Sequence, residues 1–145
     1  MKALRLTVIL SLIFTGIQAQ NSSEEAKITA KAIDYLQAWH QGDSELMLST
    51  IHPQMAKKVV FDTGFKNGAV AFLSAQDLLA QTKKKRPEFL DRDALAERVK
   101  ILDSYRNTAT VKVDANNWID YLHMAKISGE WRIVNILWEL KTEEL

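Results

Sequence analysis

Apolar residues recur three or four positions apart after residue 22, the spacing that places side chains on one face of an α-helix. The set is Ile28, Ala32, Tyr35, Leu36 and Trp39. Ser22 and Glu25 form a capping-box pattern before it, and Gly42 suits the left-handed residue that ends a helix. The pattern predicts a first helix over about residues 23–41.

A second, shorter helix follows in the pattern. Asp43 can cap it, Leu46 and Met47 supply its apolar side, and Pro53 closes it, because the residue before a proline disfavours helix. Residues 57–72 then favour a hairpin, with strands at 59–61 and 69–72 around a turn region rich in glycine.

A third helix is predicted to open at Ser74 with Asp77 and to end before Pro87. The four cations of residues 83–86 lie at its C-terminal end, where the helix dipole favours positive charge. We interpret them as a solvated cap. Residues 88–97 fit either a short helix or a loop.

The apolar period changes to two from Arg98 onward, which is typical of strands. The pattern predicts four strands at residues 98–106, 108–115, 117–128 and 131–141, with Ser128-Gly129 as a tight turn. Helices first and a meander of strands afterwards indicate an α+β fold, in which helices cover one face of an antiparallel sheet.

Both faces of the last two strands carry apolar residues, so the outer face needs a cover. We therefore expect a homodimer through that face. One side of the last strand has no charged residue after Arg132, so we expect that side to form the concave face. Its residues are Val134, Ile136, Trp138 and Leu140.

The start of the chain has the layout of a signal peptide. Lys2 and Arg5 precede an apolar run over residues 6–14 that is too short to span a membrane. We expect cleavage near Ala19, export to the periplasm or the extracellular space, and a single domain over residues 20–145. No cysteine follows the run, so we expect no lipid anchor on the mature chain.

The composition narrows the function classes. Basic and acidic residues nearly balance, which does not favour a nucleic-acid partner. The chain has no cysteine, so disulfides, thiolate zinc sites and cysteine nucleophiles are excluded. Its three histidines, His40, His52 and His123, lack metal-ligand spacing, and we expect neither a metal nor a cofactor.

The C-terminal part of the chain, from Asp120-Tyr121-Leu122 to Gly129-Glu130-Trp131-Arg132-Ile133-Val134-Asn135, resembles the end of the family named Putative lumazine-binding. That family belongs to the nuclear-transport-factor-2-like superfamily. The resemblance covers about residues 24–141. It implies a cystatin-like cone, with helices packed on a strongly bent antiparallel sheet and a pocket at the open end, but it defines no reaction.

Inward-pointing aromatic and polar residues are the candidates for lining such a pocket. The candidate ligand-binding residues are Tyr35, Trp39, His52, Phe61, Tyr121, His123 and Trp138. Pockets of small-molecule sites are mostly apolar with a few polar groups. The leading hypothesis is therefore an exported protein that binds a small apolar or aromatic molecule.

Two other functions stay open. His123 could act as a general base with Tyr121 as a hydrogen-bond donor, since alternate positions share a strand face; Asp120 then points to the other face. That would make the protein a cofactor-free proton-transfer enzyme of the isomerase or dehydratase type. Alternatively, the cone is filled by its own side chains, and the protein is a structural or interaction module.

Overall fold

The structure, a computed structural model, describes residues 23–61 and 69–141, apart from the side chains of Phe61 and Ala69. The chain is helical over residues 23–41, in agreement with the predicted first helix. Three shorter helices follow: α2 (Ser44–Thr50), α3 (Ala75–Lys83) and α4 (Arg92–Ala96). Asp43 caps α2 and a capping box of Ser74 and Asp77 opens α3, so both predicted helix starts are confirmed.

Six strands form one open sheet in the order β2-β1-β6-β5-β4-β3. They are β1 (Ile51–Phe61), β2 (Ala69–Ser74), β3 (Val99–Tyr105), β4 (Thr108–Asp114), β5 (Trp118–Ile127) and β6 (Glu130–Leu140). All neighbouring pairs are antiparallel except β1 and β6, which run parallel. The α+β class is therefore confirmed with a mixed sheet: α3 and α4 carry the chain to the far edge, and the returning meander brings β6 alongside β1.

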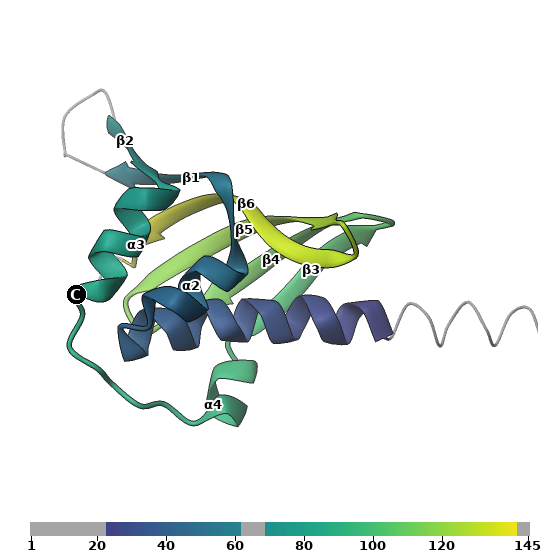
Figure 1. The fold of residues 1–145 in the computed structure, drawn as a ribbon, viewed down its shortest axis with the longest axis horizontal. Coiled ribbons are helices and arrows are strands. Elements are labelled where there is room, and N and C mark those ends of the chain that lie inside the picture. Colours follow the sequence, from purple (N-terminus) through teal and green to yellow (C-terminus); the bar gives the residue numbers. More distant parts are fainter. Residues whose placement is uncertain (1–22, 62–68, 142–145) are drawn as a thin grey trace, which may run out of the picture.

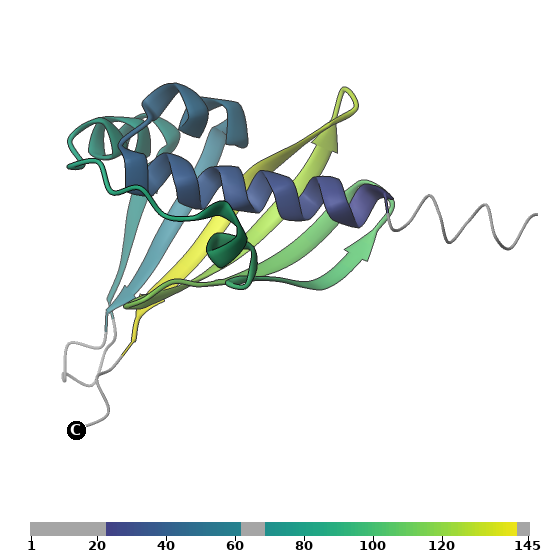
Figure 2. The ribbon, with the colours of Figure 1, turned by 90° about the horizontal axis from the view of Figure 1, so that it is seen from below.

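The first helix lies along one face of the sheet, and α2 and α3 lie over the end formed by β1 and β2 (Figures 1 and 2). The core fills the space between this helix and the strands, with Leu36 from the helix and Leu122 and Ile136 from β5 and β6 all fully buried. No helix in the described ranges is both long enough and apolar enough to cross a membrane.

A β-bulge in β6 changes which residues of that strand face the core. His123 pairs with Asn135 but Met124 pairs with Ile133, so Val134 is the extra residue. Before the bulge Trp131 and Ile133 are buried, and after it Ile136 is buried and Trp138 packs against the core. The expected concave set was thus correct for Ile136 and Trp138, and for Leu140, which lines the same cavity as Trp138, and wrong for Val134; Trp131 also faces inward.

β1 begins directly after α2 instead of beyond Pro53, so the predicted boundary of the second helix was too late. Pro53 is tolerated because it lies where the pairing of β1 with β6 shifts register, between Ile51 and Ala56. A proline has no N–H to donate, and such irregular positions do not require one.

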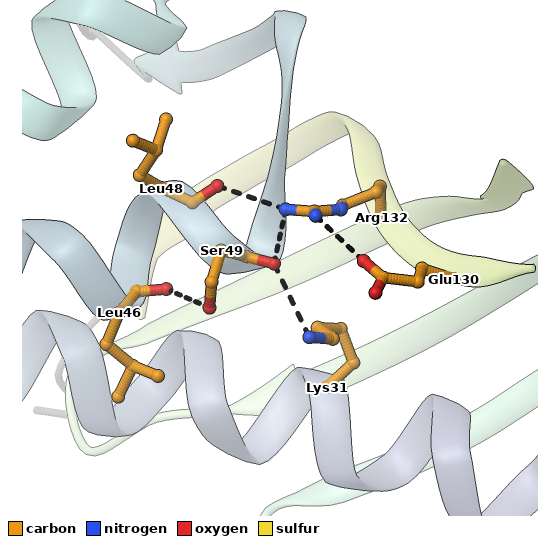
Figure 3. A network of polar contacts seen from close by, with 6 residues as sticks. All are labelled: Lys31, Leu46, Leu48, Ser49, Glu130 and Arg132. Atoms are coloured by element: carbon orange, nitrogen blue, oxygen red, sulfur yellow. Dashed lines mark hydrogen bonds and ion pairs between the residues drawn. The ribbon is translucent and has the colours of Figure 1, made fainter. Parts of the chain in front are cut away.

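The C-terminal carbonyls of α2 accept hydrogen bonds from side chains of β6 and of the first helix (Figure 3). Arg132 Nη1 donates to the carbonyl oxygens of Leu48 at 3.2 Å and Ser49 at 2.6 Å, and Lys31 Nζ donates to Ser49 O at 3.4 Å. Cations are favourable at a helix C-terminus, where carbonyls lack partners within the helix. These contacts set the corner at which the chain enters β1.

Candidate functional site

A cavity of about 280 Å³ lies between the first helix, α3 and strands β1, β5 and β6. Its walls include Tyr35 and Trp39 from the first helix, Lys57 from β1, and Trp118 and Trp138 from β5 and β6. Three tryptophans and a tyrosine around one buried lysine form a mostly apolar enclosure with a polar floor, the usual composition of a small-molecule site.

Asp120 does not itself line the cavity but connects three of the side chains that do. Its side chain is fully buried on the inward face of β5, between the apolar positions Trp118 and Leu122. Its carboxylate accepts hydrogen bonds from Trp118 Nε1 at 2.9 Å, from Tyr35 Oη at 3.1 Å and from Lys57 Nζ at 3.2 Å. A buried charge is tolerated only when it is paired and hydrogen-bonded, and these three donors meet that requirement.

Lys57 lies across β6 from Asp120, because β1 and β5 flank β6 in the sheet. It is 8% exposed and shares the inward face of β1 with Met55 and Val59. Its Nζ donates to Tyr35 Oη at 2.8 Å and lies 5.1 Å from the centroid of the Trp138 ring. Burial lowers the pKa of the Lys57 ammonium, and the nearby Asp120 carboxylate only partly opposes that effect.

Tyr35 connects the other two groups. Its hydroxyl accepts from Lys57 and donates to Asp120. Burial, together with the Asp120 carboxylate, raises the pKa of this phenol well above its usual value, so Tyr35 stays protonated. An amine, a phenol and a carboxylate thus form a continuous hydrogen-bonded path along which a proton can pass at the floor of the cavity.

The mouth of the cavity carries a further cation. Lys85, just after α3, places its Nζ 4.9 Å from the centroid of the Trp39 ring, within the range of a cation–π contact. This lysine belongs to the basic run interpreted from the sequence as a solvated cap; its side chain is exposed but it also lines the cavity.

A larger and more open hollow of about 880 Å³ lies at the other end of the first helix, along Glu24 and Tyr105. Of its lining residues, Glu24 is already paired, since it accepts from Lys126 Nζ at 2.8 Å and from Trp131 Nε1 at 3.0 Å. The smaller cavity is the better candidate because it has the buried titratable groups.

The structure distributes the residues expected at the pocket over several places. Tyr35, Trp39 and Trp138 line the same cavity. His52 lies in a separate surface hollow with Leu48 and Arg132. Phe61 ends β1, and its side chain lies outside the described part of the chain.

Tyr121 and His123 are on the outer face of the sheet, away from the cavity. Tyr121 is 41% exposed, and His123 is exposed with its Nδ1 3.2 Å from Asn135 Nδ2. Alternation along β5 puts Asp120, Leu122 and Met124 inward and therefore Tyr121 and His123 outward. From the sequence, Tyr121 and His123 were expected to face the cavity and Asp120 to face the other way. The structure shows the reverse arrangement.

Lys57, Asp120 and Trp118 were not among the expected site residues. The sequence pattern did contain a sign of the role of Asp120. It shares a strand face with Leu122 and Met124, so it is a carboxylate on an otherwise apolar face. Lys57 was missed because the hairpin strand was expected to begin near residue 59, whereas β1 begins at Ile51. Among the described residues, no group of three histidine, aspartate or glutamate side chains could hold a metal ion.

Known structures define the class of this fold. A nuclear transport factor 2-like protein of unknown function from Silicibacter pomeroyi DSS-3 has a TM-score of 0.65 and 17% identity, covering 83% of this chain and 98% of that one. A second from Shewanella baltica OS155 has a TM-score of 0.62 and 16% identity, covering 84% and 97%. A third, from Novosphingobium aromaticivorans DSM, with a cystatin-like fold, has a TM-score of 0.50 and 13% identity, covering 91% and 90%. The protein therefore has the nuclear-transport-factor-2-like, cystatin-like fold.

Within that class, residues 23–139 match the family model described as Putative lumazine-binding, and the chain belongs to that family. This confirms the resemblance found in the C-terminal strands. A curated relative, the aldolase FrzH of Cladobotryum sp, is 27% identical over 124 residues, which cover 79% of this chain and 89% of that protein.

Proposed function

We propose that this protein is exported and binds a small, mostly flat and apolar molecule in the cavity between the first helix and the sheet. The observation that carries the proposal is the combination of aromatic walls with the buried Lys57–Asp120–Tyr35 cluster at the floor. A filled core would not need to bury a charged pair there, whereas a binding site uses a few polar groups to orient its ligand.

The chemistry of the lining indicates a ligand with an oxygen acceptor at one end. Trp39 and Trp138 come from opposite walls and can stack on a flat ring system, which contributes about 0.5–1.5 kcal/mol beyond burial. At the floor, Lys57 supplies a hydrogen-bond donor, and Trp138 Nε1 is buried without a hydrogen-bond partner among the described residues. A carbonyl or carboxylate oxygen would suit these donors.

A ligand screen by thermal unfolding tests the proposal. We expect aromatic carbonyl or carboxylate compounds to raise the melting temperature of residues 20–145, and Trp39→Ala and Trp138→Ala each to weaken binding. Tyr121→Ala is the matched control, because Tyr121 is exposed on the outer face and should leave the affinity unchanged. If no compound in a broad screen stabilises the protein, the structural-module function is favoured.

Catalysis in the same cavity is the second candidate function. It is favoured by an inward acid, Asp120, within hydrogen-bond distance of both a phenol and an amine, the arrangement that proton-transfer chemistry needs. The name of the relative FrzH, an aldolase, also points to chemistry at a carbonyl compound. Asp120→Asn and Tyr35→Phe should then abolish turnover of a carbonyl substrate while ligand binding persists.

We also propose that two copies associate through the outer face of the sheet, as the apolar character of the last strands suggests. Tyr121 and Leu137 are directly opposite each other there and are 41% and 40% exposed. Export rests on the sequence of residues 1–19. N-terminal sequencing of the protein secreted by an expressing cell should begin close to Gln20.

A further inference from the structure

We infer that Lys57 is a nucleophile that forms an imine with an aldehyde or ketone bound in the cavity. This inference rests on the proposed binding function and specifies the ligand class as carbonyl compounds. The cavity would hold the apolar part of such a compound against the tryptophans and present its carbonyl carbon to Lys57 Nζ.

The position of the amine carries the inference. Lys57 is on the wall of the cavity, yet its side chain is only 10% exposed, so the nitrogen is reached through the cavity. Two of the three hydrogens of the ammonium are directed to Tyr35 Oη and Asp120 Oδ1. The third hydrogen is available to a ligand in the cavity. The Trp138 ring, whose centroid is 5.1 Å from Lys57 Nζ, lines the same cavity and would contact that ligand.

Burial lowers the pKa of the Lys57 ammonium, so this lysine reaches the neutral form that attacks a carbonyl more readily than an exposed lysine does. A lysine desolvated in an apolar pocket loses its proton more readily, which is how imine-forming lysines are activated. Asp120 Oδ1 is 3.2 Å from Nζ and can take the proton. Every lysine of the run 83–85 is exposed, as is Lys58 beside Lys57, so these ammonium groups remain hydrated.

The step balances with the residues present. Lys57 first gives one proton to Asp120, and its nitrogen then bonds to the carbonyl carbon while a proton moves from nitrogen to oxygen, giving a carbinolamine. Asp120 returns its proton through Tyr35 to the hydroxyl, the carbon–oxygen bond breaks, and the oxygen leaves as water. The product is an iminium ion on Lys57 beside the Asp120 carboxylate, so ammonium and carbonyl yield iminium and water.

Reductive trapping of the mature protein tests this step. The protein is incubated at neutral pH with benzaldehyde and sodium cyanoborohydride, which reduces an iminium to a stable benzylamine. Peptide mass spectrometry then gives the extent of benzylation at each lysine. We expect Lys57 to be modified at least tenfold faster than Lys58, its exposed neighbour, and Asp120→Asn to slow the reaction at Lys57. Modification of Lys57 no faster than of Lys58 would overturn the inference.

Two controls separate this inference from the proposed binding function. Lys58→Met should leave trapping at Lys57 unchanged. In Lys57→Met, the total benzylation of the protein should fall to the slow modification of its surface lysines. Binding of benzyl alcohol, which has the same ring but no carbonyl, is followed by tryptophan fluorescence in both variants and in the wild type. Quenching by benzyl alcohol without trapping at Lys57 means that the cavity binds ligands but forms no imine. Absence of both signals defeats both proposals.

Discussion

Lys57 and Asp120 are charged residues that the fold withdraws almost completely from water. Each belongs to a strand next to β6, where Lys57 is level with Ile136 and Asp120 with Trp138. Desolvation costs several kcal/mol for each ion, and their attraction offsets it only when the geometry is good and the remaining hydrogen bonds are made. Tyr35 and Trp118 make those bonds, so the cluster is tolerable as a whole but sensitive to the loss of one member.

Removal of the lysine alone should therefore be costly. We expect Lys57→Met to lower the free energy of unfolding by about 3–5 kcal/mol, because it leaves Asp120 buried without a counter-ion. The double variant Lys57→Met/Asp120→Asn should regain most of this loss, since a neutral amide oxygen can still accept from Tyr35 and Trp118. Urea unfolding of the two variants and the wild type measures both values. A double variant less stable than Lys57→Met would contradict the account.

Glu24 provides a pH-dependent contact at the other end of the first helix. Hydrogen bonds from Lys126, Lys27 and Trp131 lower its pKa from 4.5 to about 2. Since the folded state holds the proton less tightly than the unfolded state, this contact stabilises the fold above pH 4.5 and its contribution is lost as the pH falls towards 2.

Thermal unfolding between pH 6 and pH 2 checks the contribution of Glu24. We expect Glu24→Gln to flatten the decline in melting temperature below about pH 5, the region in which an ordinary glutamate begins to take up its proton. Glu25→Gln serves as the control, because Glu25 is exposed and forms no ion pair with any described residue. Equal acid profiles for Glu24→Gln and the wild type would show that the Lys126 contact does not contribute.

At the scale of elements, the connections depend on two glycines in the left-handed region. Gly42, with φ of 69°, ends the first helix, and Gly129, with φ of 86°, is in the turn between β5 and β6. Their surroundings differ: a Cβ on Gly42 would lie 2.9 Å from Lys85 O, whereas a Cβ on Gly129 would meet nothing within 4 Å. The first helix and the end of α3 can approach closely only because residue 42 has no side chain.

Alanine at these two positions should have unequal effects. Gly129→Ala should cost about 1–2 kcal/mol, the backbone penalty of a left-handed residue with a side chain. Gly42→Ala should cost more, because the end of α3 must also move away from the new methyl group, and α3 forms one wall of the cavity. Denaturant unfolding compares the two variants. Equal losses would show that the approach of Lys85 to Gly42 is unimportant.

At the scale of the whole molecule, the sheet separates the cavity from the proposed dimer surface. The first helix covers the inner face of the sheet (Figures 1 and 2), which holds the core and the cavity. On the outer face, Tyr121 and Leu137 are exposed to solvent. Association through the outer face would bury these residues without blocking the cavity, because the two sites are on opposite faces of the same strands.

A charge on the outer face should therefore separate the proposed dimer. We expect sedimentation velocity at micromolar concentration to show a dimer for residues 20–145 and a monomer for Leu137→Lys. Leu48→Lys is a suitable control, because Leu48 is 51% exposed on α2, which covers the inner face, and should remain dimeric. A monomeric wild type would defeat the proposal.

Local sequence patterns were enough to predict most of the elements and the fold class. The first helix, the caps at Asp43 and Ser74, the hairpin of β1 and β2 and the four-strand meander all follow from short-range periodicity and turn chemistry. Tyr35, Trp39 and Trp138 could also be named, because large aromatic residues at helix and strand spacing point inward wherever the register is regular. The residues of the C-terminal strands further indicated the family.

Only the tertiary structure determined which charged residues form the candidate site. Lys57 and Asp120 are 63 residues apart, on strands that become near neighbours only because β6 inserts between them and runs parallel to β1. The bulge at Val134 changed which side chains of β6 face inward, because a shift of one residue moves a side chain to the opposite face. The early start of β1 placed Lys57 within a strand. Short-range periodicity contains no information about such long-range register, so the buried lysine and its carboxylate were evident only once the strands were assembled.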